Sequence, residues 1–400
     1  MRQPRLAPLF VAVLAVGSVV AMTMIVMLVW FVSAQGEAGT WESLVTALSA
    51  AAAALAVILL LHITLTAAGR GVDARRQSAT AEWARRWSEV SAGGDVPDVP
   101  SDAREVAAEA AAQILTHLDG EGARLVRRAL KSSGLLASEL IAATRGLGAP
   151  RSRATAVVER LAWIAMPEAM PVFRRAANCR DERAATAAVL GATRVLADQP
   201  DPEELGPEVV ATIEDYVRAA SIPAGTRSFL AAALTSSGDH LPWLCRTLLR
   251  RAEHEAIHIA ALDAIGISRR PEAVDLATEA LENAMEDETE SAALRTLARL
   301  GSVPASAVPT VLAAAEEAHA GTRVQAAYAL VWTDLTVALP ALWKLLGDMS
   351  WEVRQAAAYA LQNCGPLGMD ALQRASEQHP DRFARDVASI VGVPAPEPSG

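Results

Sequence analysis

Two histidines and a glutamate lie close together near the middle of the chain, in the order HEAIH over residues 254–258. On a helix this spacing places His254 and His258 one turn apart, where both can bind a zinc ion. Glu255 would then lie beside the metal as the general base of a hydrolase. The motif is the one signal for an enzyme in the sequence.

The third ligand that a catalytic zinc ion needs is missing from the expected places. An extended form of the motif would require Gly at position 261 and His at position 264, and both positions are Ala. Glu279 lies near the spacing of another ligand set, but it falls in the next predicted helix pair. We therefore expect a structural pair of histidines, no bound metal and no cofactor. A zinc-dependent hydrolase that uses residues 254–258 is the alternative.

The helix that carries this motif belongs to a series of similar segments, which is clearest at residues 340–365. The sequence there predicts one helix that begins at Pro340 and a second from Trp351 to about Asn363, capped by Ser350. The second helix contains RQAAAYAL, and RVQAAYAL occurs 31 residues earlier (354 − 323 = 31). A charged residue followed seven positions later by a core-facing apolar residue recurs in Arg354/Leu361, Arg323/Leu330, Glu290/Leu297, Glu255/Leu262, Arg227/Leu234, Arg183/Leu190 and Arg151/Val158.

The repeat length points to a solenoid of stacked helix pairs. Neighbouring charged positions are separated by 28 residues at the least (255 − 227) and 44 at the most (227 − 183). Units of this length cannot bury their apolar faces alone and therefore stack on one another. In this register Glu255 takes the place of the recurring Arg and His258 faces the core, so packing also explains the HEAIH motif.

The repeated segments resemble the HEAT-repeat family, in its short bacterial form. The resemblance covers residues 101–392 and is strongest over 305–365. It is carried by a Pro in the first helix (Pro340, Pro309, Pro271, Pro242), an Asp in the turn (Asp348, Asp181) and an Arg early in the second helix (Arg354, Arg323, Arg227, Arg183, Arg151). It implies an all-α solenoid that binds proteins and specifies no reaction. Glu in the Arg position at 255 and 290 implies that an Asp–Arg ladder between repeats is interrupted there.

Two apolar stretches precede the repeats. Residues 6–32 contain no charged residue, and residues 44–68 contain His62 as their one ionisable side chain, so each is able to span a bilayer. The first stretch has the alternative of a cleavable signal ending at Ala34, although its length favours a retained anchor. Arg residues lie before the first stretch and after the second, and none lies between them. The positive-inside rule then predicts a multi-pass inner-membrane protein with both termini and the solenoid in the cytoplasm.

The segment after the membrane hairpin (residues 1–69) is basic. Residues 70–90 predict a helix in which Trp83 and Trp87 and five arginines suit an anionic bilayer surface, namely Arg70, Arg75, Arg76, Arg85 and Arg86. A Gly- and Pro-containing linker follows and completes a segment over residues 70–100. The solenoid is then expected over 101–392, beginning with a helix capped by Ser101, and a disordered tail over 393–400.

Charge and cysteine content narrow the function further. Residues 1–86 hold seven Arg and four acidic residues, a net charge of +3. The whole chain has a net charge of −10, so residues 87–400 carry −13. An acidic solenoid argues against nucleic acid as a partner, because binding phosphates needs a basic surface. The three cysteines, Cys179, Cys245 and Cys364, show no metal-binding spacing, and we expect buried free thiols.

The side chains that should face the inner surface of the solenoid differ from repeat to repeat. Positions two, five and nine residues after the charged position point away from the core. In the last three clear repeats they are large or polar: Arg295, Arg299, Gln325, Tyr328, Trp332, Tyr359 and Asn363. Aromatic residues and Arg are the side chains that dominate protein interfaces. These residues are therefore the predicted protein-binding surface.

Together these patterns predict a non-catalytic, membrane-anchored scaffold whose cytoplasmic solenoid binds a membrane-associated or cytoplasmic protein. Similar membrane-tethered bacterial proteins look like companions of envelope-polysaccharide glycosyltransferases. The resemblance therefore implies that the partner is an enzyme of that class. The lipid bilayer is the second expected partner.

Overall fold

The computed structural model of the chain describes residues 73–147, 153–219 and 224–392. These residues form α-helices, short turns and brief 3-10 segments, and they contain no strand, which confirms the all-α class. The predicted membrane spans at 6–32 and 44–68, Arg70 and the tail at 393–400 lie outside the described residues. Within those residues, no helix has both the length and the apolar character needed to cross a membrane.

The chain divides into two compact units, Met1–Arg85 and Arg86–Gly400. A helix covers residues 73–91, close to the predicted 70–90, and Arg75 and Arg85 are exposed on it. The prediction that both indole rings face a bilayer is wrong. Trp83 is buried, and Trp87 is fully buried with its Nε1 donating a hydrogen bond of 2.9 Å to the carbonyl oxygen of Ala107. Burial of a large indole ring is favourable when its N–H finds a hydrogen-bond acceptor, so the core is a more stable place for Trp87 than an exposed surface.

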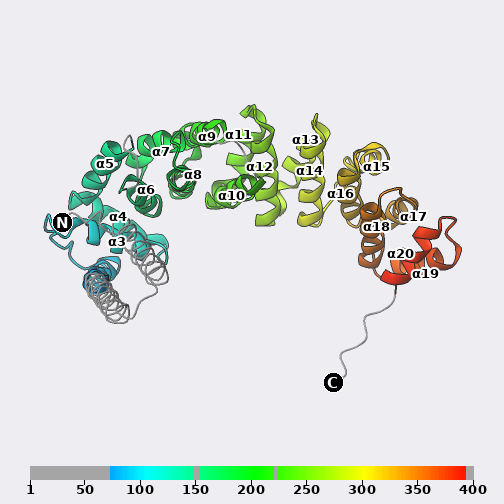
Figure 1. The fold of residues 1–400 in the computed structure, drawn as a ribbon, viewed down its shortest axis with the longest axis horizontal. Coiled ribbons are helices and arrows are strands. Elements are labelled where there is room, and N and C mark those ends of the chain that lie inside the picture. The colour runs from blue at the N-terminus through cyan, green and yellow to red at the C-terminus, as the bar shows by residue number, and fades with distance from the viewer. Residues whose placement is uncertain (1–72, 148–152, 220–223, 393–400) are drawn as a thin grey trace, which may run out of the picture. The chain divides into compact units, whose positions relative to one another are not determined.

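The second unit consists of helices joined by short turns (Figure 1). They are α3 (Arg104–Leu115), α4 (Gly120–Ser132), α5 (Leu135–Gly146), α6 (Arg153–Ile164), α7 (Met170–Ala177), α8 (Glu182–Ala197), α9 (Pro202–Ala219), α10 (Ala224–Thr235), α11 (Leu241–Arg251), α12 (Glu255–Ser268), α13 (Val274–Glu282), α14 (Asp287–Leu300), α15 (Val308–Glu317), α16 (Ala320–Leu330), α17 (Leu335–Leu346), α18 (Trp351–Asn363), α19 (Pro366–Gln378) and α20 (Arg382–Val391). The first of these begins three residues after Ser101, and Ala103 is at its N-cap position.

From α5 onward an odd-numbered helix packs against the following even-numbered helix to form a repeat, except for α9, which packs against α7, α8 and α11. The even-numbered helices from α6 to α20 pack against one another in order. Neighbouring even-numbered helices run parallel. At the start of α16 the Thr322 hydroxyl donates to the Asp287 carbonyl oxygen at the start of α14 (3.3 Å). Further along α14, the Thr296 hydroxyl donates to the Leu262 carbonyl oxygen of α12 (2.8 Å). Parallel packing brings residues at the same position in successive helices side by side.

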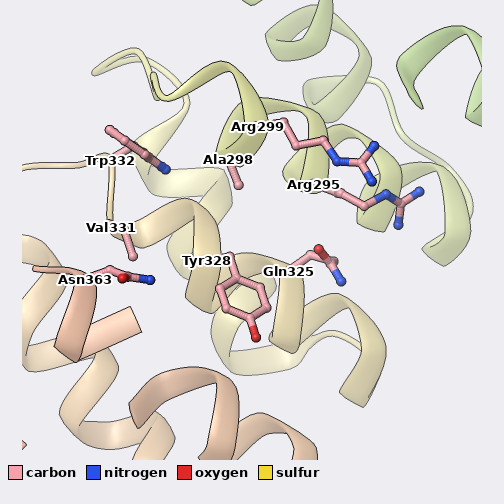
Figure 2. Close-up of a pocket in the computed structure, with 8 residues that line it drawn as sticks. All are labelled: Arg295, Ala298, Arg299, Gln325, Tyr328, Val331, Trp332 and Asn363. Atoms are coloured by element: carbon pink, nitrogen blue, oxygen red, sulfur yellow. The ribbon is translucent and has the colours of Figure 1, made fainter. Parts of the chain in front are cut away.

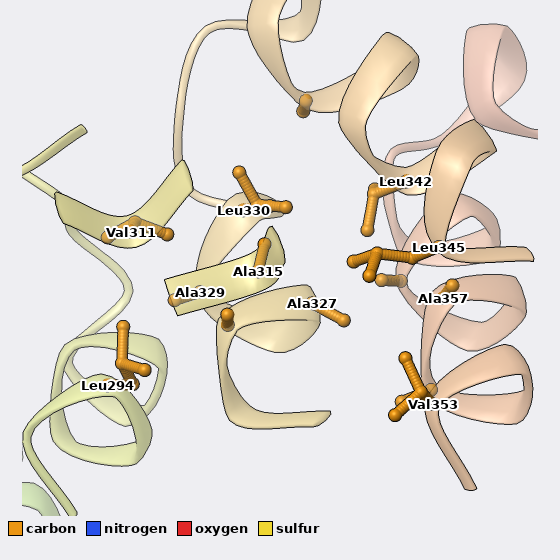
Figure 3. Packing of buried hydrophobic residues seen from close by; sticks show 14 of the residues in the cluster. Leu294, Val311, Ala315, Ala327, Ala329, Leu330, Leu342, Leu345, Val353 and Ala357 are labelled. Carbon is orange, nitrogen blue, oxygen red and sulfur yellow. The ribbon is translucent and has the colours of Figure 1, made fainter. Parts of the chain in front are cut away.

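The core between the helices is built from Leu, Val and many Ala side chains (Figure 3). Leu330 and Leu361, the predicted core residues of the two most similar repeats, are fully buried. Small Ala side chains beside them, such as Ala327 and Ala357, allow neighbouring helices to approach closely. The predicted apolar positions are buried in the other repeats also, except Leu190, which is half-buried.

The register of the last six repeats is more regular than the sequence suggested. The fourth residue of each even-numbered helix from α10 to α20 is Arg227, His258, Glu290, Arg323, Arg354 or Arg385, at intervals of 31, 32, 33, 31 and 31 residues (for example 258 − 227 = 31). Glu255 is the first residue of α12 rather than the fourth, so its placement in the Arg position is wrong. The long interval before Arg227 reflects the 18 residues of α9.

The two helix starts predicted around residues 340–350 differ in detail. The helix that contains Pro340 begins at Leu335, because Asp334 caps it: its Oδ1 accepts a hydrogen bond of 2.8 Å from the Thr336 backbone N–H. Ser350 is at the N-cap position of α18, as predicted, but its hydroxyl donates to Glu352 instead of capping the helix. The backbone N–H of Ser350 donates to Asp348 Oδ1 (2.8 Å), so the side chain of the turn aspartate, and not that of Ser350, accepts a backbone hydrogen bond at this helix start.

Candidate functional site

The HEAIH segment does not have the geometry of a zinc-binding helix. The helix begins at Glu255, and His254 precedes it with an extended backbone (φ −95°, ψ 119°). The two histidines are therefore not one helical turn apart on a common face. The carboxylate of Glu255 accepts a hydrogen bond from the Thr289 hydroxyl of the neighbouring helix (3.3 Å), which ties α12 to α14.

His258 makes the hydrogen bond that Arg makes in other repeats. Its Nε2 donates to the carbonyl oxygen of Ala252, six residues earlier, at 2.9 Å. At the same position of other helices, Arg323 Nη1 donates to the Ala318 carbonyl oxygen (2.7 Å), Arg354 Nη1 to that of Asp348 (3.0 Å) and Arg385 Nη1 to that of His379 (2.6 Å). The second histidine of the motif is thus a structural equivalent of the repeat arginine.

The other candidate metal ligands are engaged elsewhere. Glu279 lines the same cavity of about 350 Å³ as His258, but its carboxylate is paired with Arg250 Nη2 (3.1 and 3.3 Å). Among the described residues, no three His, Cys, Asp or Glu side chains come together as a metal site. The cysteines are free; Cys245 is buried, and that burial raises the pKa of its thiol, whereas Cys179 and Cys364 are half-buried.

The predicted protein-binding residues gather around a cavity of about 620 Å³ formed by α14, α16 and α18. Six of the seven line it, Tyr359 being the exception, and Ala298 and Val331 complete the wall: Arg295, Arg299, Gln325, Tyr328, Trp332 and Asn363. Figure 2 shows the two arginines on one side and Trp332, Val331 and Asn363 on the other, with Tyr328 between them. Tyr359 is exposed on α18, outside the cavity. We name these eight lining residues the α14–α18 cavity.

Both arginines of the cavity are held by Asp263 of α12. Arg295 donates from Nε to Oδ1 (2.9 Å) and from Nη2 to Oδ2 (3.2 Å) of this carboxylate, and Arg299 donates from Nη1 to Oδ1 (3.1 Å). Sequence reasoning missed Asp263. It is the ninth residue of its helix, as Arg295, Tyr328 and Tyr359 are of theirs, so the corrected register identifies it.

The remaining polar side chains of the cavity are not paired within the described structure. The amides of Gln325 and Asn363, the Tyr328 hydroxyl and the Trp332 indole N–H make no side-chain hydrogen bond to another described residue. Trp332 and Tyr359 are also among the large apolar side chains that remain exposed, at 48% and 41%. The cavity therefore offers donors, acceptors and aromatic surface to a molecule that enters it.

Gly301 ends α14 beside the Trp332 ring. It has the left-handed conformation (φ +71°), which a glycine adopts without the penalty that other residues incur. A Cβ built on it would lie 3.5 Å from the nearest ring atoms of Trp332, an ordinary contact distance. The indole therefore lies against the end of α14, where it forms one side of the cavity.

Comparison with known proteins gives one family match. Residues 274–362, from the start of α13 to the last turn of α18, match the family model described as HEAT repeats. This segment includes every residue of the α14–α18 cavity except Asn363. The chain matches no curated protein.

Solved structures with a similar fold include an engineered protein, at 18% identity over 77% of this chain and 93% of that one, with a TM-score of 0.34. Importin beta is 15% identical over 79% of this chain and 47% of its own, with a TM-score of 0.37. Kap121p bound to Nup53p is 13% identical over 78% of this chain and 41% of its own, with a TM-score of 0.39. The chain spans less than half the length of the latter two.

Proposed function

We propose that this protein is a non-catalytic adaptor, anchored in the inner membrane by residues 1–69, whose cytoplasmic solenoid binds a protein partner at the α14–α18 cavity. A HEAT-repeat solenoid is typical of scaffolds that present an extended surface to other proteins. The observation that supports this site most is the gathering of two arginines and two aromatic rings around one cavity, with unpaired polar groups between them. The partner is either a membrane-associated or a cytoplasmic protein, and an envelope-polysaccharide enzyme belongs to the first class.

Two large side chains of the cavity extend beyond the core. Trp332 is about half exposed and the side chain of Arg299 is 42% exposed, whereas Ala327 and Leu330 of the preceding helix α16 are fully buried. Tyr, Trp and Arg are the residues whose truncation most often weakens protein complexes. The exposed surface of these residues, beside the partly buried Tyr328, is therefore best explained by a partner.

The double substitution Tyr328→Ala and Trp332→Ala tests this proposal. We expect the partner that co-purifies with the full chain from native membranes to be lost, because removal of interface aromatics lowers affinity by roughly thirtyfold or more. The helical melting curve should remain close to that of the wild type. The control is Leu367→Ala with Phe383→Ala, which removes two exposed apolar side chains outside the cavity. Recovery of the partner at the wild-type level with a folded double variant would show that docking occurs elsewhere.

A further inference from the structure

We propose that the α14–α18 cavity binds an extended, acidic segment of the partner, in which an Asp or Glu lies about three residues from a proline or an aromatic residue. This inference rests on the proposed function and specifies the chemistry of the bound segment. Three features of the cavity support it: its charge, the geometry of its arginines and the distance between the arginines and the indole ring.

The cavity is positively charged in an acidic protein. The chain has a net charge of −10, yet the lining residues include two arginines and no carboxylate. Asp263 lies behind the arginines and compensates one of their two charges. One positive charge remains in excess, and the side chain of Arg299 is 42% exposed. A carboxylate from a partner would complement this charge and would be favoured over a basic group.

Asp263 also orients the arginines for a second carboxylate. Its two oxygens hold Arg295 through Nε and Nη2, while Arg299 uses a single nitrogen, Nη1. A guanidinium has more N–H donors than these bonds occupy, and it favours paired hydrogen bonds to a carboxylate. Because the side chains are already fixed, binding would cost less conformational entropy than the ordering of two free arginines.

The opposite side of the cavity suits a flat apolar ring. Trp332, about half exposed, lies over Gly301 with Val331 beside it. Proline and aromatic rings pack well on an indole face, as in the recognition of extended proline-containing peptides. An extended segment also brings unpaired backbone N–H and C=O groups, which need partners. The unpaired groups of Gln325, Tyr328 and Asn363 lie between and beside the two ends to provide them.

The spacing of the segment follows from positions along α14. Arg295 projects from this helix, and the Trp332 ring lies against Gly301 at its end, six residues further on. An α-helix rises about 1.5 Å per residue, so these positions are about 9 Å apart along the axis. Because an extended chain advances about 3.3 Å per residue, a bound segment would place its carboxylate and its ring about three residues apart.

Selection from a peptide library tests the inference directly. The full chain in detergent micelles would be used to select from random nine-residue peptides displayed on phage. We expect the enriched peptides to share an Asp or Glu about three residues from Pro, Trp, Tyr or Phe. For one such peptide, replacement of its acidic residue by the amide should weaken binding about tenfold, a typical effect of one charged contact.

Variants of the cavity separate this inference from the proposed function. Arg299→Gln should remove the preference for the acidic peptide over its amide form, and the matched surface control Arg374→Gln should retain it. Melting curves of each variant identify any that fail to fold, and in that case Arg295→Lys provides a milder test of the same contact.

Three outcomes would overturn the inference. If peptides bind in a manner that depends on Tyr328 and Trp332 but show no acidic preference, the proposed function stands and the acidic segment is wrong. If no selected peptide depends on Trp332 or Arg299, both proposals fail. If removal of residues 393–400, which contain the sequence PAPEPSG, is needed before any peptide binds, the occupant is the chain's own tail rather than a partner.

Discussion

Arg323 and Asp348 form a two-pronged ion pair between consecutive repeats, with Nε donating to Oδ2 and Nη2 to Oδ1, each at 2.8 Å. Both side chains are largely buried, at 20% and 11% exposure. Asp348 also accepts a hydrogen bond from the Ser350 backbone N–H and so orders the turn before α18. The Asp348 carboxylate therefore links α16 to the start of α18, the second helix of the next repeat.

The first prediction concerns the stability of this link. Asp348→Asn should lower the free energy of unfolding by about 2 kcal/mol, because a hydrogen bond to a charged group is lost and the arginine is left without its counter-charge. Urea unfolding followed by circular dichroism measures the change. The control is Glu316→Gln, which removes the exposed pair with Lys344 and should change stability by only a few tenths of a kcal/mol. Equal effects of the two substitutions would contradict the structural role of Asp348.

The second prediction concerns acid stability. Burial disfavours the charged form of Asp348, but the hydrogen bonds from Arg323 and Ser350 and the charges of Arg323 and Arg354 outweigh it and hold the pKa of this carboxyl below its usual value. A lowered pKa stabilises the folded state above the unfolded pKa of about 3.9, and the contribution is lost as the pH falls through the folded pKa. The difference in urea midpoint between wild type and Asp348→Asn should therefore be constant from pH 7 to 5 and shrink below about pH 4. A difference that grows on acidification would contradict this.

The third prediction concerns the HEAIH motif. His258→Arg should preserve stability, because Arg makes the equivalent hydrogen bond in other repeats and the cavity of about 350 Å³ beside His258 has room for it. His258→Ala should cost about 1 kcal/mol, the usual contribution of one hydrogen bond. Glu255→Gln should leave partner binding intact. Zinc analysis of purified protein is the independent measurement: one zinc ion per chain that is lost from folded His258→Ala protein would restore the hydrolase alternative.

The repeats were predictable because packing requires an apolar residue at the same position of every repeat, and this regular spacing is visible in the sequence. Leu330 and Leu361 are apolar since each must fill the core, and their spacing revealed the repeat. The starts of the helices were less predictable. Pro340 is tolerated inside α17, and the helix begins at a cap, Asp334, that a rule based on proline overlooks.

For the candidate site, the sequence predicted which side chains point away from the core, but it did not predict which charged residues pair with one another. Tyr328 and Trp332 were assigned to the exposed face from helical periodicity alone. Asp263 was overlooked because the register of α12 was counted from Glu255 instead of from His258. An ion pair between helices 32 residues apart leaves no local pattern, so its recognition requires the correct alignment of repeats.

The fourth prediction separates the core from the cavity. Leu330→Ala should lower stability by about 2–5 kcal/mol, because it leaves a void at a fully buried position. Trp332→Ala, only two residues away and about half exposed, should change stability far less. Thermal melts of the two variants provide the measurement. If Trp332→Ala is as destabilising as Leu330→Ala, the ring is a structural element of the α14 end and its role in the docking site must be reconsidered.

The last prediction concerns the membrane. We expect residues 6–32 and 44–68 to cross the bilayer as a hairpin, because each is long and almost free of charge while arginines flank the pair on one side. A reporter fused after residue 38 should then be active in the periplasm, and one fused after residue 95 should be active only in the cytoplasm. Replacing Arg2 and Arg5 by Glu is the informative control, since it should weaken the preference of the first span without changing its hydrophobicity. A periplasmic signal from the fusion at residue 95 would place the solenoid on the other side of the membrane and exclude a cytoplasmic partner.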